Sequence, residues 1–149
     1  MKKILLSAIT AIFCIPTFTV NANAVEITKA PSDVVVYSAG LITSYKVSVS
    51  ASGTTLYLSG STCCSSQMAS VGITDIQVQY SSDNTKWYDY MTSSDLKKSN
   101  SRQYTASSIK IGTVKSGYYY RVTCKHYAKE SGLFGSSENI SDTSNSVWV

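Results

Sequence analysis

A single histidine and a few cysteines are the residues of this chain that could support nucleophilic chemistry. His126 is the only histidine, and three cysteines, Cys63, Cys64 and Cys124, lie beyond residue 24. A catalytic cysteine needs its thiolate beside the imidazole. Cys124 and His126 are two positions apart in an expected strand, so their β-carbons lie about 7 Å apart, beyond hydrogen-bond contact. We therefore expect a structural role for His126.

The motifs of hydrolases and of metal sites are missing. The sequence has no Gly-x-Ser-x-Gly pattern and no Asp-x-Asp-x-Asp spacing of the kind that binds calcium. Cys63 and Cys64 are adjacent, whereas zinc-binding cysteines are usually separated by two residues. We predict a protein that is not an enzyme and needs neither metal nor cofactor, with a hydrolase as the least favoured function. The aspartates lie at expected turns and strand ends, where nothing marks a catalytic pair: Asp75, Asp83, Asp89 and Asp95.

Aromatic side chains are the strongest indication of binding. Trp87, Tyr88 and Tyr90 lie in one short expected strand, and Tyr119 and Tyr127 have outward parity in another. Exposed Tyr and Trp side chains can stack on sugar rings or dock against a protein. We predict that these five residues bind the ligand, with Tyr88, Tyr90 and Tyr119 exposed on one face. The alternative is that Trp87 belongs to the core and the tyrosines merely suit a β surface.

Alternating side chains place these aromatic residues on β-strands. Apolar and polar residues alternate with a period of two, which predicts half-buried strands. Abundant Ser and Thr, with little Leu and Ala, disfavour helix. The layout predicts an antiparallel β-sandwich of seven or eight strands. Strands are expected at residues 33–37, 45–50, 56–64, 76–80, 87–91, 109–111, 118–125 and 144–149, with loops at 65–72, 92–102 and 130–137 and a turn at 83–84.

The first 24 residues have the organisation of a secretory signal peptide. Two lysines precede an apolar run, and Ala22 and Ala24 fit the small-x-small cleavage rule. We predict cleavage after Ala24, secretion, and a single domain over residues 25–149. The apolar run is too short and too mixed for a membrane span. A lipoprotein anchor at Cys14 is disfavoured because a large residue precedes it.

The charge distribution excludes nucleic acid as a partner. The formal net charge of +4 includes Lys2 and Lys3 of the predicted signal peptide, so the remainder carries two positive charges fewer. No basic run is longer than Lys97-Lys98, whereas nucleic-acid-binding domains cluster their positive charge. Secretion would place the chain in an environment that permits disulfides.

One segment resembles a signature of fibronectin type III domains and related immunoglobulin-like sandwiches. Val114 takes the apolar position that ends one strand, Gly117 the turn glycine, and Tyr120 the tyrosine that opens the next strand. Ser116 occupies the position where the family usually has proline. The resemblance implies a structural role for Tyr120, whose hydroxyl would reach back to a backbone carbonyl.

The chain is also similar to a loosely defined group of short secreted proteins from clostridia-like Gram-positive bacteria. The shared features are the signal peptide, a Ser-Gly-Thr-Thr-Leu-Tyr-like strand at residues 52–58, Ser65-Ser66, and Gly-Tyr-Tyr-Tyr-Arg-Val at residues 117–122. No activity is assigned to this group, so the resemblance implies secretion and nothing more specific.

Strand parity indicates how the cysteines could pair. Cys64 and Cys124 both share the parity of inward positions in their strands. In a sandwich these strands face each other, so a Cys64–Cys124 bridge is the first expectation. The alternatives are a Cys63–Cys124 bridge, a vicinal Cys63–Cys64 bond, and three reduced thiols.

These observations predict a secreted, non-enzymatic binding or structural module. Its aromatic sheet face would bind an extracellular glycan, a cell-wall component or a protein. The alternative is a secreted effector, an inhibitor or bacteriocin-like factor that acts on neighbouring cells. Binding to cell walls would favour the first function, and inhibition of cells by the purified protein would favour the second.

Overall fold

The chain forms an entirely antiparallel β structure. The computed structural model describes residues 36–37 and 40–149, which contain eight strands and no helix. The predicted all-β antiparallel class is therefore confirmed. The predicted signal peptide and most of the strand expected at 33–37 lie outside the described residues. The strands are β1 (Val36–Tyr37), β2 (Ile42–Ser52), β3 (Thr55–Ser81), β4 (Tyr88–Thr92), β5 (Leu96–Thr113), β6 (Tyr119–Lys129), β7 (Ser137–Thr143) and β8 (Val147–Trp148).

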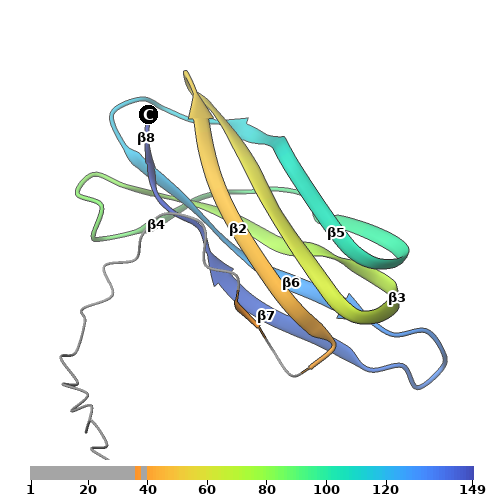
Figure 1. Ribbon diagram of the computed structural model, residues 1–149. Coiled ribbons are helices and arrows are strands. Elements are labelled where there is room, and N and C mark those ends of the chain that lie inside the picture. Colours follow the sequence, from red (N-terminus) through yellow and green to blue (C-terminus); the bar gives the residue numbers. More distant parts are fainter. Residues whose placement is uncertain (1–35, 38–39) are drawn as a thin grey trace, which may run out of the picture.

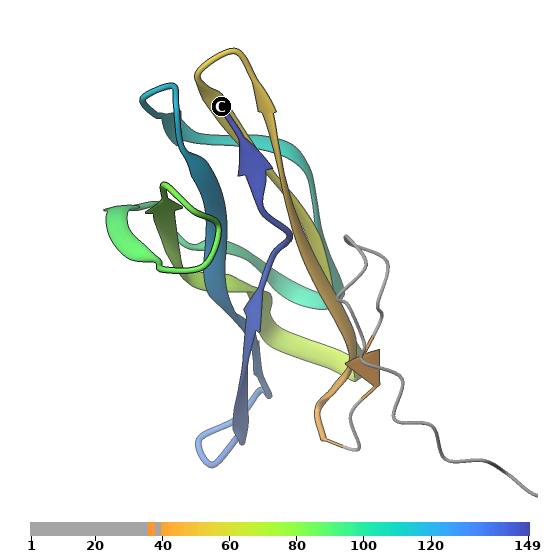
Figure 2. The ribbon, with the colours of Figure 1, turned by 90° about the vertical axis from the view of Figure 1, so that its left-hand side faces the viewer.

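β3 organises the sheet because it belongs to both of its halves. Residues 55–64 of β3 pair with β2 along one edge, and residues 70–81 pair with β6 along the same edge. β5 and then β4 follow the other edge. The register shifts between Cys63 and Met68, and the strands form one continuous sheet that curls into a half-barrel (Figures 1 and 2). Among the described residues, the pairing does not divide into the two separate sheets of the expected sandwich.

Two segments predicted as loops are strands. Residues 65–72 continue β3, and residues 96–102 begin β5. Ser70 pairs with Lys129 of β6 on one side and with Ser99 of β5 on the other. Backbone hydrogen bonding to a strand on each side therefore holds residues 70–73 extended. The first part of β5 is polar because its side chains are largely exposed, not because the backbone is irregular.

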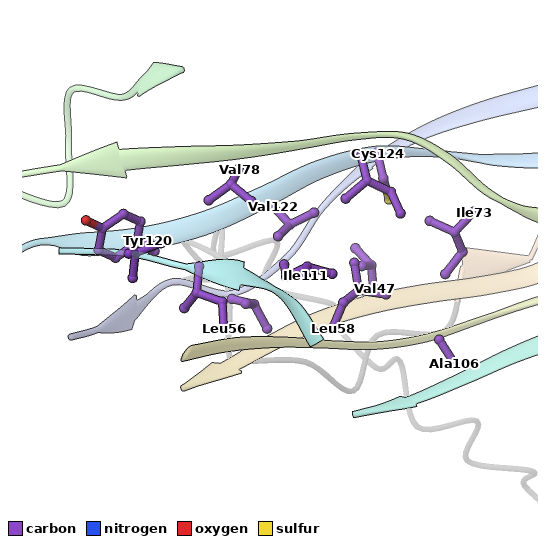
Figure 3. Close-up of a cluster of buried hydrophobic side chains, with 13 residues drawn as sticks. Val47, Leu56, Leu58, Ile73, Val78, Ala106, Ile111, Tyr120, Val122 and Cys124 are labelled. Carbon is purple, nitrogen blue, oxygen red and sulfur yellow. The ribbon is translucent and has the colours of Figure 1, made fainter. Parts of the chain in front are cut away.

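The hydrophobic core fills the concave side of the curled sheet. Leu56 and Leu58 from the first half of β3 face Val78 from its second half and Val122 from β6 (Figure 3). All four side chains are fully buried, which explains the period of two in the sequence. A smaller second cluster consists of Ile42, Cys64, Met68, Val71 and Ala128.

Tyr120 fixes the turn that leads into β6. Gly117 in this turn has a φ of 87°, a conformation that favours glycine. The Tyr120 hydroxyl donates a hydrogen bond of 2.9 Å to the backbone carbonyl of Lys115, and the residue is fully buried. Burial raises the pKa of Tyr120, so the hydroxyl keeps its proton at neutral pH. The hydrogen bond that the sequence resemblance implied for Tyr120 is present.

Candidate functional site

Aromatic residues lie on both faces of one end of the sheet. β4, β3, β6 and β8 are neighbours there. Tyr80 of β3 lies opposite Tyr120 of β6, and the preceding residue, Gln79, lies opposite Arg121. Successive residues of a strand point to opposite faces. Tyr80 therefore faces inward with the buried Tyr120, while Gln79 and Arg121 face outward.

The inner face carries a group of five tyrosines. The Tyr80 ring contacts three other rings, at centroid distances of 5.6 Å to Tyr88, 6.0 Å to Tyr90 and 5.5 Å to Tyr118. Tyr90 also contacts Tyr120, at 5.6 Å. These are the distances of favourable aromatic pairs. We call this group the inner tyrosine cluster: Tyr80, Tyr88, Tyr90, Tyr118 and Tyr120.

A β-bulge orients the exposed members of this cluster. Val78 pairs with Met91, but Gln79 pairs with Asp89, so Tyr90 is an extra residue in β4. The bulge allows Tyr90 to contact the inner cluster although its neighbour Met91 packs against the core. Tyr88 remains 55% exposed, and Tyr90 is also exposed. The inner cluster therefore presents two tyrosine rings at the edge of the sheet.

The outer face combines aromatic rings with fixed polar groups. The Arg121 guanidinium lies over the Trp87 ring, 4.3 Å from its centroid, in a cation–π contact. Arg121 Nε donates to Gln79 Oε1 at 2.9 Å, and Gln79 Nε2 donates to Asp89 Oδ1 at 2.9 Å. Partial burial lowers the pKa of Arg121, although a guanidinium stays charged at physiological pH.

An exposed indole extends this face across β8. The Trp148 ring lies 4.7 Å from the Tyr119 ring in an edge-to-face arrangement, and Trp148 is 55% exposed. Tyr119 shares the outward parity of Arg121 in β6. This face therefore has the exposed Trp148 ring on one side and the charged, planar Arg121 guanidinium on the other. We call it the outer aromatic face: Gln79, Trp87, Asp89, Tyr119, Arg121 and Trp148.

The structure separates the five residues predicted to bind ligand. Tyr88 and Tyr90 belong to the inner tyrosine cluster, whereas Trp87 and Tyr119 belong to the outer aromatic face. Tyr119 cannot share a face with Tyr88, because its neighbour Tyr120 is the residue aligned with Tyr80 and Tyr88. Tyr127 has outward parity but lies opposite Gly72, about 26 Å along β6 from Tyr119.

Sequence reasoning missed several members of the outer aromatic face. Arg121 lies two positions from Tyr119, so the same parity that selected Tyr119 also selects Arg121. Trp148 falls in the predicted last strand, but no sequence pattern shows that β8 lies beside β6. Gln79 falls in the strand expected at residues 76–80, and only the cross-strand pairing brings it to Arg121.

His126 lies in a buried polar network. Its Nδ1 is 2.8 Å from Thr62 Oγ1, which also donates to the Gly72 carbonyl at 2.9 Å. Its Nε2 is 3.4 Å from Asp142 Oδ2 but makes no hydrogen bond. A hydroxyl, an imidazole and a carboxylate thus lie next to one another in space. Thr62 and His126, however, have no surface exposed to solvent. The network links β3, β6 and β7.

The cysteines in the described part of the chain are all free thiols. Cys64 belongs to the second cluster and Cys124 to the main core, so the predicted Cys64–Cys124 bridge is not formed, nor are the alternatives with Cys63. The reason is that Cys64 lies beside β2, before the bend in β3, whereas Cys124 lies beside β7. Burial raises the pKa of Cys64 to about 11 and that of Cys124 to about 12. Both thiols are therefore protonated and poorly nucleophilic at neutral pH.

Known proteins give no lead. Comparison with protein-family models, curated proteins and solved structures finds no match to this chain. Within residues 36–37 and 40–149, no group of three or more His, Cys, Asp or Glu residues could hold a metal ion. The same residues contain no helix that is long and apolar enough to cross a membrane.

Proposed function

We propose that the protein is a secreted, non-enzymatic binding module that recognises a glycan of a cell surface or cell wall. Its binding site is the outer aromatic face. The observation that supports this most directly is the exposed Trp148 ring beside Tyr119, on the same face as the Trp87–Arg121 stack.

The chemistry of this face suits a sugar. An aromatic ring packs against the apolar face of a pyranose, and neighbouring polar groups bond its hydroxyls. Gln79, Asp89 and Arg121 supply such donors and acceptors. Because they already bond one another, little side-chain entropy is lost on binding. Four adjacent strands at about 4.8 Å spacing make the face about 14 Å wide, enough for more than one ring.

The proposal includes export and a relation to immunoglobulin-like folds. Export after cleavage behind Ala24 is supported by the lysines, apolar run and small residues of the first 24 positions. A relation of the curled sheet to fibronectin type III-like sandwiches is supported by the Tyr120–Lys115 hydrogen bond after the Gly117 turn.

A second candidate function is a secreted effector, such as an inhibitor or a bacteriocin-like factor. The observation that favours it is the inner tyrosine cluster, whose exposed Tyr88 and Tyr90 lie at a sheet edge. Tyrosines are enriched where proteins bind proteins. The two candidates therefore use opposite faces of the same strands.

A depletion experiment distinguishes them. Purified exported protein is incubated with insoluble cell walls and glycans, and the protein left in solution is measured. Trp148→Ala and Tyr88→Ala form a matched pair, because both residues are 55% exposed but lie on opposite faces. We expect Trp148→Ala to weaken binding about tenfold or more and Tyr88→Ala to leave it unchanged. The reverse result would move the site to the inner tyrosine cluster. No depletion of the unmodified protein would refute glycan binding.

A further inference from the structure

Two apolar side chains project from the tip of the β6–β7 hairpin. Leu133 is 92% exposed and Phe134 is 94% exposed, far more than any other large apolar residue in the described part of the chain. Neither contributes to either core cluster. Folding therefore gains almost nothing from them, and an apolar pair in this position calls for another explanation.

The loop is built to hold this pair outward. Gly135 N–H donates to the Gly132 carbonyl, so Leu133 and Phe134 occupy the two central positions of a β-turn. Glycine, asparagine, aspartate and proline are the usual residues at such positions. Glu130 closes the base of the loop: its N–H donates to the Ser136 carbonyl at 2.9 Å, and its carboxylate accepts from Ser136 N–H at 3.2 Å.

The size and shape of the tip fit a lipid bilayer better than a protein. Two side chains of this kind offer no more than about 500 Å², even at the area of a large aromatic residue. A stable protein interface buries about 800 Å² on each partner. The flanking residues are only serine and glycine, so they add little apolar surface. A convex apolar point can enter the boundary between headgroups and acyl chains without a complementary surface.

Two basic side chains near the tip indicate that the lipid surface is anionic. Lys129 ends β6 just before the loop, and Ser70 pairs with both Lys129 and Ser99, the neighbour of Lys98. The Cα atoms of Lys98 and Lys129 are therefore roughly 10 Å apart, and the two side chains extend from opposite faces of the sheet, because Lys98 lies opposite Val71 and Lys129 lies opposite its neighbour Ser70. Both are exposed, and neither forms an ion pair with another described residue. Glu130, by contrast, is already engaged within the loop.

We infer that the β6–β7 hairpin tip docks the protein on an anionic membrane surface. Leu133 and Phe134 enter the acyl boundary, while Lys129 and Lys98 meet anionic headgroups. This site is separate from the outer aromatic face, because Tyr119 and Lys129 lie at opposite ends of β6, about 33 Å apart. The exported protein would thus bind a membrane at one end and a glycan at the other.

Vesicle sedimentation tests this inference without any glycan. The exported chain is mixed with vesicles of phosphatidylcholine alone or with phosphatidylglycerol added, and the bound fraction is measured. We expect stronger binding to the anionic vesicles, weakened by salt. Each of Leu133→Asn and Phe134→Asn should weaken it about tenfold or more. Ile109→Asn, an exposed apolar position on β5, is the matched control and should change nothing.

Two further variants make the test decisive. Lys98→Gln with Lys129→Gln should abolish the preference for anionic vesicles. In the Phe134→Trp variant, a quencher dissolved in the lipid phase should quench the fluorescence of the new indole. The fluorescence of Trp87 and Trp148 in the unmodified protein should not be quenched. Binding that survives substitution of both Leu133 and Phe134, or the absence of vesicle binding, would overturn the inference. Self-association that the same substitutions abolish, without vesicle binding, would show that the tip docks a second copy instead. The thermal transition of each variant confirms that it folds.

Discussion

The hydroxyl of Thr62 on β3 lies 2.8 Å from Nδ1 of His126 on β6, and neither residue has exposed surface. Thr62→Val keeps the shape of the side chain but removes its only polar group. The imidazole and the Gly72 carbonyl would then lose a buried partner, so we expect a loss of about 2 kcal/mol in the free energy of unfolding. Urea denaturation measures it. Thr105→Val, at an exposed position of β5, should have little effect; an equal loss there would contradict the role of the network.

The Tyr120 hydroxyl offers a second test of a buried contact. Tyr120→Phe removes only the hydrogen bond to the Lys115 carbonyl. We expect a stability loss of about 1 kcal/mol, measured as a lower urea midpoint with an unchanged slope. Tyr119→Phe is the matched control one position away. If the two substitutions cost the same, the Tyr120 hydroxyl does not stabilise the turn.

Asp83 should make stability depend on acid pH. Its Oδ1 accepts the backbone N–H groups of Lys86 and Thr85, each at 2.9 Å, and these bonds hold its pKa well below the ordinary range. A carboxyl with a lowered folded-state pKa stabilises the fold above its unfolded pKa of about 3.9, and this contribution is lost as pH falls through the folded-state value. Asp83→Asn should therefore reduce stability at pH 6, and the difference from the unmodified protein should shrink below about pH 4.

Denaturation at pH 6, 4, 3 and 2 checks this dependence. Asp89→Asn is the control, because Asp89 accepts from the side-chain amide of Gln79 rather than from backbone groups. A difference between Asp83→Asn and the unmodified protein that stays constant over this pH range would show that the charge of Asp83 contributes nothing.

Thiol labelling of a protein that comprises residues 25–149 should distinguish its three cysteines. Cys64 and Cys124 are buried with raised pKa values of about 11 and about 12, whereas Cys63 is partly exposed. At pH 8 we expect an alkylating reagent to modify Cys63 first, and the other two only after denaturation. Mass spectrometry of the labelled peptides gives the order. Fewer than three reactive thiols in the denatured, unreduced protein would reveal a disulfide and overturn the assignment of free thiols.

Two glycines should respond differently to the same substitution. A Cβ at Gly72 would collide with the Leu96 carbonyl and the Lys97 backbone of β5, whereas a Cβ at Gly112 meets only the end of the flexible Met91 side chain. We expect Gly72→Ala to cost about 1–3 kcal/mol or to displace β5, and Gly112→Ala to cost less. Thermal unfolding compares them. Equal transitions would mean that β5 adjusts without strain.

The sequence predicts the local features of this fold better than its long-range ones. Alternation identifies the buried positions of β2, β3 and β6, because it depends on neighbouring residues. The corner hydrogen bond of Tyr120 is implied by the sequence resemblance around Gly117 and Tyr120, which is also local. Composition fails at residues 65–72 and 96–102, where pairing with strands far along the chain holds polar segments extended. The disulfide prediction is wrong for the same reason. Parity predicts the face toward which Cys64 and Cys124 point, but not the distance between them, which depends on the bend of β3.

The candidate site shows the same limit. Trp87 could be chosen from the sequence because it lies in a short aromatic run, and Tyr119 because it has outward parity in an expected strand. Their separation from Tyr88 and Tyr90 depends on the register of β3 between β4 and β6, which no local pattern contains. Trp148 joins the site only because β8 returns to pair beside Tyr119.

The passage of β3 through both halves of the sheet also dictates an order of events during folding. Residues 55–64 can close a hairpin with β2 as soon as they are made, but residues 70–81 must wait for β6, whose Tyr119 pairs with Ser81. Until then residues 73–80 expose unpaired backbone N–H and C=O groups together with apolar side chains, which favours aggregation. Chaperone capture of nascent chains should therefore be concentrated on this segment and should end once β6 has been synthesised.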